Sequence, residues 1–86
     1  MKLAIKNLTR RPRPRLNFRR IAEQVLGRRY DLSLVFIGNA RARTLNRVWR
    51  GKDQPANILT FPLEQNGGEI FLNLDQISGI DLGPLL

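Results

Sequence analysis

YDLSLVFIGNARARTLNRVWRG, residues 30–51, contains a strand, a break and a helix in direct succession, and this stretch decides the fold class. From Tyr30 to Ile37, apolar residues fall on both faces of a period-2 pattern, as in a central strand of a sheet. Gly38 and Asn39 interrupt the pattern, and Asn39 is a residue type that caps helix N-termini. The stretch therefore predicts a buried strand that leads directly into a helix.

The helix is predicted to end at Trp49 or Arg50, with Gly51 in the left-handed position that terminates many helices. Helical spacing predicts a buried stripe made of Ala42, Leu45, Val48 and Trp49. The same spacing aligns three guanidinium groups on another face, those of Arg43, Arg47 and Arg50.

Towards the N-terminus, residues 1–7 alternate apolar and polar side chains, which predicts a half-buried strand. Residues 9–15, TRRPRPR, are predicted to form a loop, because two prolines remove backbone donors and hold the residues before them extended. From Leu16 to about Arg28, apolar residues recur at helical spacing, and Gly27 is a suitable helix end.

Towards the C-terminus, residues 57–61 and 69–74 are short runs rich in strand-forming residues, and the turn signal QNGG separates them. They predict a hairpin. Residues 78–86 have glycines, a proline and no sustained period, so we expect an irregular tail. The expected fold is a single small α+β domain over residues 1–77, with about four strands in a mixed sheet, two helices and the order β-α-β-α-β-β.

Charge is divided sharply along the chain. Residues 1–52 carry all fifteen Lys and Arg residues and two acids, a net charge of +13, whereas residues 53–86 carry five acids and no basic residue, a net charge of −5. A clustered basic surface attracts polyanions and steers them towards the protein. RNA is the polyanion that we expect as a partner.

Length and composition exclude several classes of protein. A chain of 86 residues allows a single domain and no large second one. The absence of cysteine excludes a disulfide framework and a thiolate metal site, and it fits a reducing cytoplasm. No apolar run approaches the roughly 20 residues that span a bilayer, so we expect a cytoplasmic protein without a membrane partner.

Residues 45–64, LNRVWRGKDQPANILTFPLE, carry a more specific signal. They resemble the YbeY family of bacterial rRNA maturation endoribonucleases, whose hallmark is LN-x-x-[YW]-RGKD-x-P-[TA]-[DN]-[VI]-L-[ST]-FP. The order of elements agrees, and Gly68-Glu69-Ile70 is similar to the family's Gly-Asp-Ile. The resemblance covers roughly residues 30–75, with Gln54 where the family often has Lys and Glu69 where it usually has Asp.

The resemblance implies a domain that binds single-stranded or end regions of ribosomal RNA and has a zinc-dependent hydrolytic site. In the family, a later segment of the form His-Gly-x-Leu-His-Leu-x-Gly-Tyr-Asp-His supplies three zinc-binding histidines. A catalytic zinc needs three protein ligands and an open position for water, but this chain contains no histidine. We therefore expect the family's C-terminal catalytic helices and the metal cofactor to be absent, and the chain to be inactive alone.

The candidate site residues are basic. The resemblance makes Arg50 the family's functionally important arginine, and its fixed fork of donors suits bidentate phosphate contact or charge stabilisation at a phosphoryl centre. Arg50 is therefore the candidate catalytic residue. The expected RNA contacts are Arg10, Arg11, Arg13, Arg15, Arg43, Arg47, Arg50 and Lys52.

Structural explanations compete with these assignments. Arg50 and Lys52 also complement the helix macrodipole, and Asp53 also begins a turn. Arg43 and Arg47 are also typical of a solvated helix face, and the arginines of residues 10–15 form either an arm that docks on phosphates or a solubilising loop.

Two further features have alternative interpretations. Trp49 is a candidate for stacking on an unpaired base, but its place in the apolar stripe favours core packing. The remaining carboxylates for a hard cation match no metal loop in their spacing; they are Glu64, Glu69, Asp75 and Asp81.

Three functions are open at this point. The first is a noncatalytic RNA-binding domain of the YbeY type that acts on ribosomal RNA or the small ribosomal subunit. The second is the N-terminal part of an active endoribonuclease, completed by a missing segment or a partner that supplies the zinc helix. The third is a basic amphipathic helix at residues 16–28 on a membrane surface, which the flanking strands disfavour.

The resemblance also implies an uncovered surface, because the family's C-terminal helix packs against this sheet. We expect exposed apolar side chains around Val35, Ile58, Ile70 or Leu72. A second copy of the chain or a protein partner is expected to cover this sheet face.

Overall fold

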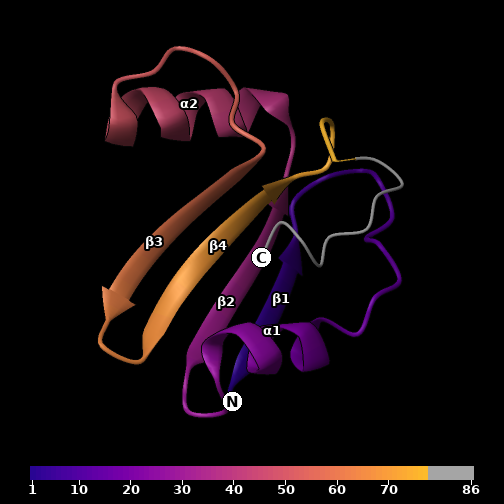
Figure 1. The fold of residues 1–86 in the computed structure, drawn as a ribbon. Helices are drawn as coiled ribbons and strands as arrows, with labels where there is room; N and C mark the ends of the chain where they lie inside the picture. The colour runs from indigo at the N-terminus through magenta and orange to yellow at the C-terminus, as the bar shows by residue number, and fades with distance from the viewer. Residues whose placement is uncertain (78–86) are drawn as a thin grey trace.

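The computed structural model describes residues 1–77, which form one four-stranded sheet and two helices (Figure 1). The elements are β1 (Leu3–Asn7), α1 (Phe18–Leu26), β2 (Asp31–Ile37), α2 (Asn39–Arg50), β3 (Ile58–Glu64) and β4 (Gly67–Asn73). The α+β class and the order β-α-β-α-β-β are confirmed. The expected tail, residues 78–86, lies outside the described residues.

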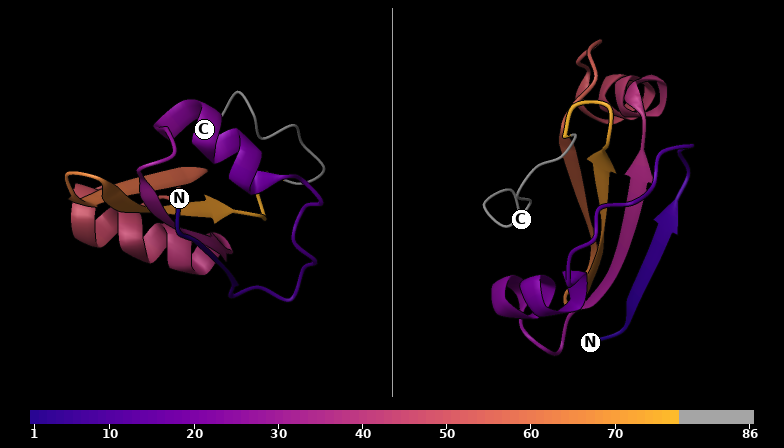
Figure 2. Two further views of the ribbon diagram at one scale, coloured as in Figure 1. Left: turned by 90° about the horizontal axis from the view of Figure 1, so that it is seen from below. Right: turned by 90° about the vertical axis from the view of Figure 1, so that its right-hand side faces the viewer.

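The sheet is mixed, as predicted, with the strand order β1-β2-β4-β3. Strands β1, β2 and β4 are parallel, and β3 pairs antiparallel with β4. The carboxyl ends of the three parallel strands therefore meet at one end of the sheet. The helix α1 lies on one face near the start of these strands, and α2 lies on the opposite face near their carboxyl ends (Figure 2).

The larger hydrophobic core lies between α1 and the sheet. Phe36 is fully buried and meets Phe18 of α1 edge to face, with ring centroids 5.5 Å apart. Burying a side chain of this size stabilises the fold by roughly 1.5–3 kcal/mol. The other buried members of this core are Ala22, Leu32, Leu34, Ile70, Leu72, Leu74 and Ile77.

The helix α1 is shorter than predicted at its N-terminus. It begins at Phe18 because the Asn17 side chain accepts a hydrogen bond from the backbone N–H of Arg20 at 3.1 Å, an N-cap that the periodicity does not reveal. Gly27 ends the helix with a φ of 84°, as predicted. Because Phe18 and Ala22 are buried in the core, the apolar side of α1 is not free to lie on a membrane.

Among residues 1–77, no helix has both the length and the apolar character required to cross a bilayer.

The buried side of α2 differs from the prediction. Ala42 is buried and Leu45 is half-buried, but Val48 is 64% exposed and Trp49 is 67% exposed. One turn after Ala42 the buried position is taken by Asn46, whose Nδ2 donates to the carbonyl of Gln54 at 2.8 Å. This bond joins the helix to the loop after α2, and the last helical turn exposes Val48 and Trp49 instead of burying them.

The prediction of an exposed apolar surface on the sheet is also wrong. Val35, Ile70 and Leu72 are buried, and Ile58 is half-buried and packs against the α1 core. On the other face, Val35 packs with Ile37 and Ala42 under the first turns of α2. The residues that were predicted to be exposed therefore belong to the two hydrophobic clusters of the fold.

Strands β3 and β4 form the predicted hairpin, but both extend further into the turn than predicted. The turn is reduced to Gln65 and Asn66, and the register shifts between Pro62 and Glu64. Gly67 and Gly68 belong to β4, where both are buried.

Replacing Gly68 by alanine is expected to lower the free energy of unfolding by about 2 kcal/mol. A Cβ at this position would lie 3.0 Å from the backbone oxygen of Phe61 and would collide with the hydroxyl of Tyr30. The Phe61 backbone belongs to the β3 ladder and cannot move away freely. Urea denaturation monitored by circular dichroism measures the change.

Gly67→Ala is the matched control for this substitution. The three atoms nearest to a Cβ at Gly67 all belong to the side chain of Glu64, which is exposed and can rotate. We expect a smaller loss for Gly67→Ala, and equal losses in the two variants would contradict the explanation.

Candidate nucleic-acid interface

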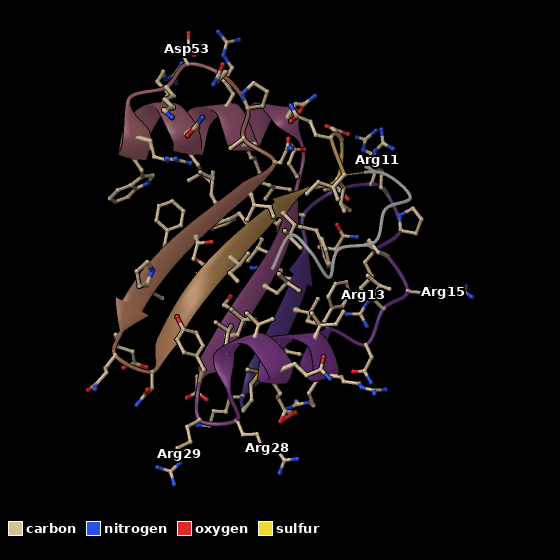
Figure 3. The ribbon with its side chains drawn as sticks, in the orientation of Figure 1. Arg11, Arg13, Arg15, Arg28, Arg29 and Asp53 are labelled. Carbon is tan, nitrogen blue, oxygen red and sulfur yellow. The ribbon has the colours of Figure 1, made fainter. Side chains whose placement is uncertain are left out.

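The predicted basic site residues fall into two groups. We call Arg10, Arg11, Arg13 and Arg15, which follow β1, the arginine loop. We call Arg43, Arg47, Arg50 and Lys52, which lie on α2 and directly after it, the α2 basic cluster. Figure 3 shows Arg11, Arg13 and Arg15 at one side of the molecule, and Asp53, beside the α2 basic cluster, above α2. The structure thus presents two basic surfaces rather than one.

Asp53 provides a counter-ion for part of the α2 basic cluster. Arg43 donates to it in a bidentate arrangement, with Nε–Oδ1 and Nη2–Oδ2 distances of 2.8 and 3.0 Å. Arg47 lies farther away, with Nη1 4.0 Å from Oδ1. The hydrogen bonding lowers the pKa of Asp53 below its usual value and raises the pKa of Arg43. The positive charges of Arg43 and Arg47 are therefore partly compensated within the protein.

Arg50 and Lys52 lie on either side of the helix end. Gly51 is left-handed, with a φ of 69°, and its N–H donates to the carbonyl of Arg47 at 3.1 Å. The bond from Gly51 is that of an αL helix end, with Gly51 in the predicted position, and the Lys52 N–H donates to the carbonyl of Asn46 at 3.2 Å. Both side chains are exposed, and within residues 1–77 neither makes a hydrogen bond or an ion pair. In the described part of the chain they are therefore uncompensated cations.

The arginine loop has an ordered beginning. The Asn7 Oδ1 accepts from the backbone N–H and the hydroxyl of Thr9, at 3.0 and 2.7 Å. The Asn7 Nδ2 then donates to the carbonyl of Arg11 at 2.7 Å. These local bonds, together with Pro12 and Pro14, restrict the backbone that carries the arginines.

Asp75 holds the arginine loop against the start of α2. Its Oδ1 accepts from Nε of Arg11 at 3.0 Å, and its Oδ2 accepts from the backbone N–H of Asn39 at 2.8 Å. The prediction that Asn39 caps α2 is therefore wrong, because the Asp75 carboxylate occupies the helix N-terminus, where the macrodipole favours an anion. The bond from Asn39, and to a lesser extent Arg11, lowers the pKa of Asp75.

Asn73 supports this junction from within the core. Its side chain is fully buried, and Nδ2 donates to Oδ1 of Asn39 at 2.9 Å and to the carbonyl of Ala56 at 3.2 Å. Its Oδ1 accepts from the backbone N–H of Asp75 at 3.0 Å. Asn73 thus connects the end of β4 to the start of α2 and to the segment before β3.

Asp75→Asn is expected to destabilise the protein at neutral pH but not in acid. Because folding lowers the pKa of Asp75, its charged-state stabilisation is fully present above the unfolded-state value of about 3.9 and is lost as the pH falls through the lower folded-state pKa. We expect the Tm of the variant to lie below the wild-type Tm at about pH 7, and the difference to shrink towards zero near pH 2. A difference of equal size at both pH values would contradict this role.

Arg41 is a basic residue of this region that the sequence prediction missed. It lines a shallow hollow of about 340 Å³ together with Arg10, Arg11 and Asp75. The positions of Arg10, Arg11 and Arg41 in the sequence could have indicated this neighbourhood. Because β1 and β2 are parallel, the residues that follow their carboxyl ends must lie near each other. Arg28 and Arg29, by contrast, point into solvent from the turn between α1 and β2, away from both groups (Figure 3).

The residues present do not fit the zinc site of the resembled family. The chain has no histidine and no cysteine, and no three metal-ligating side chains lie together within residues 1–77. Glu69 accepts a hydrogen bond from Ser33 at 3.1 Å, far in the fold from the Asp75 junction. Asp81 lies outside the described part of the chain.

Comparison with known proteins identifies the family. The sequence model of the family "Endoribonuclease YbeY" matches residues 5–80. This chain belongs to the YbeY family. The match includes the arginine loop, the α2 basic cluster and the hairpin, so the YbeY resemblance first noted at residues 45–64 extends over nearly all of the described fold.

Curated YbeY proteins match a shorter part of the chain. It is 44% identical over 57 residues to the endoribonuclease YbeY of Geobacillus thermodenitrificans (strain NG80-2), which covers 65% of this chain and 33% of that protein. It is 39% identical over 51 residues to the endoribonuclease YbeY of Anaeromyxobacter sp. (strain Fw109-5), covering 59% of this chain and 27% of that protein. The matched region thus spans 27–33% of these two relatives.

Proposed function

We propose that this chain is an RNA-binding domain of the YbeY family that contacts the phosphates of ribosomal RNA, free or in the small subunit, in the cytoplasm. The observation that supports this most strongly is the set of exposed, uncompensated cations. Arg10, Arg13, Arg15, Arg50 and Lys52 make no side-chain hydrogen bond or ion pair within residues 1–77.

The positions of these cations favour a polyanion over a small anionic ligand. They occur in two groups on different parts of the molecule, as Figure 3 indicates for Arg13, Arg15 and the Asp53 region. An extended phosphate backbone reaches both groups, whereas a single phosphate contacts only one. Relatives at about 40% identity carry the name endoribonuclease, which supports RNA as the polyanion.

We further propose that the chain does not cleave RNA by itself. A zinc hydrolase of this kind requires three protein ligands for the metal, and this chain supplies neither histidine nor cysteine.

A second candidate function follows from the share of the relatives that is matched. Since the aligned region spans 27–33% of two curated endoribonucleases, we infer as the alternative that further residues or a partner protein complete the chain into an active enzyme. In that assembly Arg50 is the residue expected to stabilise charge at the phosphoryl centre.

A salt titration of binding tests the proposal. Fluorescence anisotropy of a labelled single-stranded segment of 16S-type rRNA is measured at increasing salt with zinc present, and each recovered RNA is run on a denaturing gel. Contact with about five phosphates should give a slope of log K against log salt near −3.5. This slope with intact RNA supports a noncatalytic RNA-binding domain.

Two other results are informative. If the chain does not bind this RNA at low salt, the proposed function is wrong. If the RNA is cut in a zinc-dependent manner and Arg50→Ala abolishes the cutting, the second candidate replaces the first, and the metal is held without imidazole.

A further inference from the structure

Trp49 is a large apolar side chain held in a defined position at the surface. It is 67% exposed, although burying an aromatic ring of this size is strongly favourable. Its ring contacts Phe61 of β3 with centroids 5.9 Å apart and an interplanar angle of 67°. Phe61 in turn contacts Phe71 of β4 at 5.7 Å. The row of rings anchors Trp49 to the sheet and leaves much of the indole open to solvent.

The surroundings of Trp49 are basic. It directly precedes Arg50 in α2, and Lys52 follows one residue after the helix end. Neither cation is compensated within residues 1–77, whereas the nearby Asp53 is engaged by Arg43. An exposed aromatic ring and exposed cations at the same helix end match two parts of one nucleotide, since a base offers a flat face and its phosphate offers a negative charge.

We propose that Trp49 stacks on an unpaired base of the RNA whose phosphates Arg50 and Lys52 contact. This inference rests on the proposed function and assigns the residue that recognises the base. Stacking tolerates any base, because each has a π-face, and it requires a base that is not already stacked on both sides within a duplex. Trp49 therefore makes the α2 end selective for unpaired nucleotides, while the cations bind phosphates of any strand.

The test compares two labelled oligonucleotides, a 12-nucleotide oligouridine and its abasic analogue, which keeps the sugars and phosphates but has no bases. Trp49→Ala is expected to weaken binding of the oligouridine at least about fivefold. The variant should bind the abasic strand as tightly as the wild type does, and with the same salt slope. Trp49→Phe retains an aromatic ring and should recover most of the lost affinity.

The fluorescence of the wild-type protein provides a direct readout, because Trp49 is the only tryptophan in the chain. Oligouridine should quench its emission at saturation, and the abasic strand should not. Val48→Ala is the matched control, since Val48 is its neighbour in α2 and is 64% exposed. This control should leave both affinities unchanged.

The outcomes separate the two proposals. If the wild type binds both strands and Trp49→Ala binds them equally well, the base-stacking role is wrong and the phosphate-binding function stands. If Trp49→Ala changes the oligomeric state in sedimentation but neither affinity, Trp49 is a contact between chains and the inference is overturned. If the wild type binds neither strand, both proposals are wrong.

Discussion

Replacing Arg10, Arg13 and Arg15 together by alanine is expected to weaken binding of single-stranded RNA about 100-fold at 0.1 M salt. Each phosphate contact with a single strand contributes about 0.7 to the salt slope, so three contacts contribute about two decades of affinity at this salt concentration. The slope itself should become less steep by about 2. Fluorescence anisotropy at several salt concentrations measures both quantities. Arg11 is retained because it bonds to Asp75 and holds the loop in place.

The control for this variant removes the same charge elsewhere. Arg20, Arg28 and Arg29 are exposed and lie on α1 or in the turn after it, outside both basic groups. Their triple alanine variant lowers the net charge equally but should change the affinity and the slope much less. If both triple variants lose affinity to the same extent, binding depends on net charge alone, and the arginine loop is not a specific contact surface.

Asn73→Leu is expected to lower the free energy of unfolding by about 3 kcal/mol. Leucine has a similar volume, so the loss comes from three hydrogen bonds of about 1 kcal/mol each, whose partner groups lose these bonds. Two of these are the Ala56 carbonyl and the Asp75 N–H. Chemical denaturation measures the loss, and faster hydrogen exchange of the Asn39 amide would localise it.

Gln76→Leu provides the comparison. The Gln76 side chain is exposed and donates to the same acceptor, Oδ1 of Asn39, through one long bond of 3.3 Å. Its replacement should cost much less. If the two variants are equally destabilised, the junction is not organised around Asn73, and the Asn39 side chain is its important member.

The strands and the C-terminal ends of the helices were predictable because short stretches of sequence determine them. β2 has apolar residues on both faces and occupies the centre of the sheet. Gly27 and Gly51 end their helices with positive φ, where glycine has no steric cost. These features need no knowledge of distant residues.

The errors concern the choice between competing contacts. Hydropathy placed Val48 and Trp49 in the core, but it takes no account of the hydrogen bond that the buried Asn46 donates to the carbonyl of Gln54. The capping propensity of Asn39 was outweighed by a carboxylate from Asp75, 36 residues away. For the candidate site, the sequence suggested basic positions, without Arg41, but not which of them have internal counter-ions, because Asp53 and Asp75 reach their partners only in the folded chain.

The Asp75 junction gives the protein a fixed order of events during its synthesis. Arg11 leaves the ribosome early, whereas Asp75 follows it by 64 residues. At a translation rate of about 5–20 residues per second, Asp75 is synthesised several seconds after the arginine loop. Strand β2 likewise cannot pair with β4 until the hairpin has been synthesised. Completion of the sheet therefore depends on contacts between distant segments, and such contacts form slowly. The nascent arginines are therefore unanchored at first, and their defined geometry appears only when translation of the described fold is nearly finished.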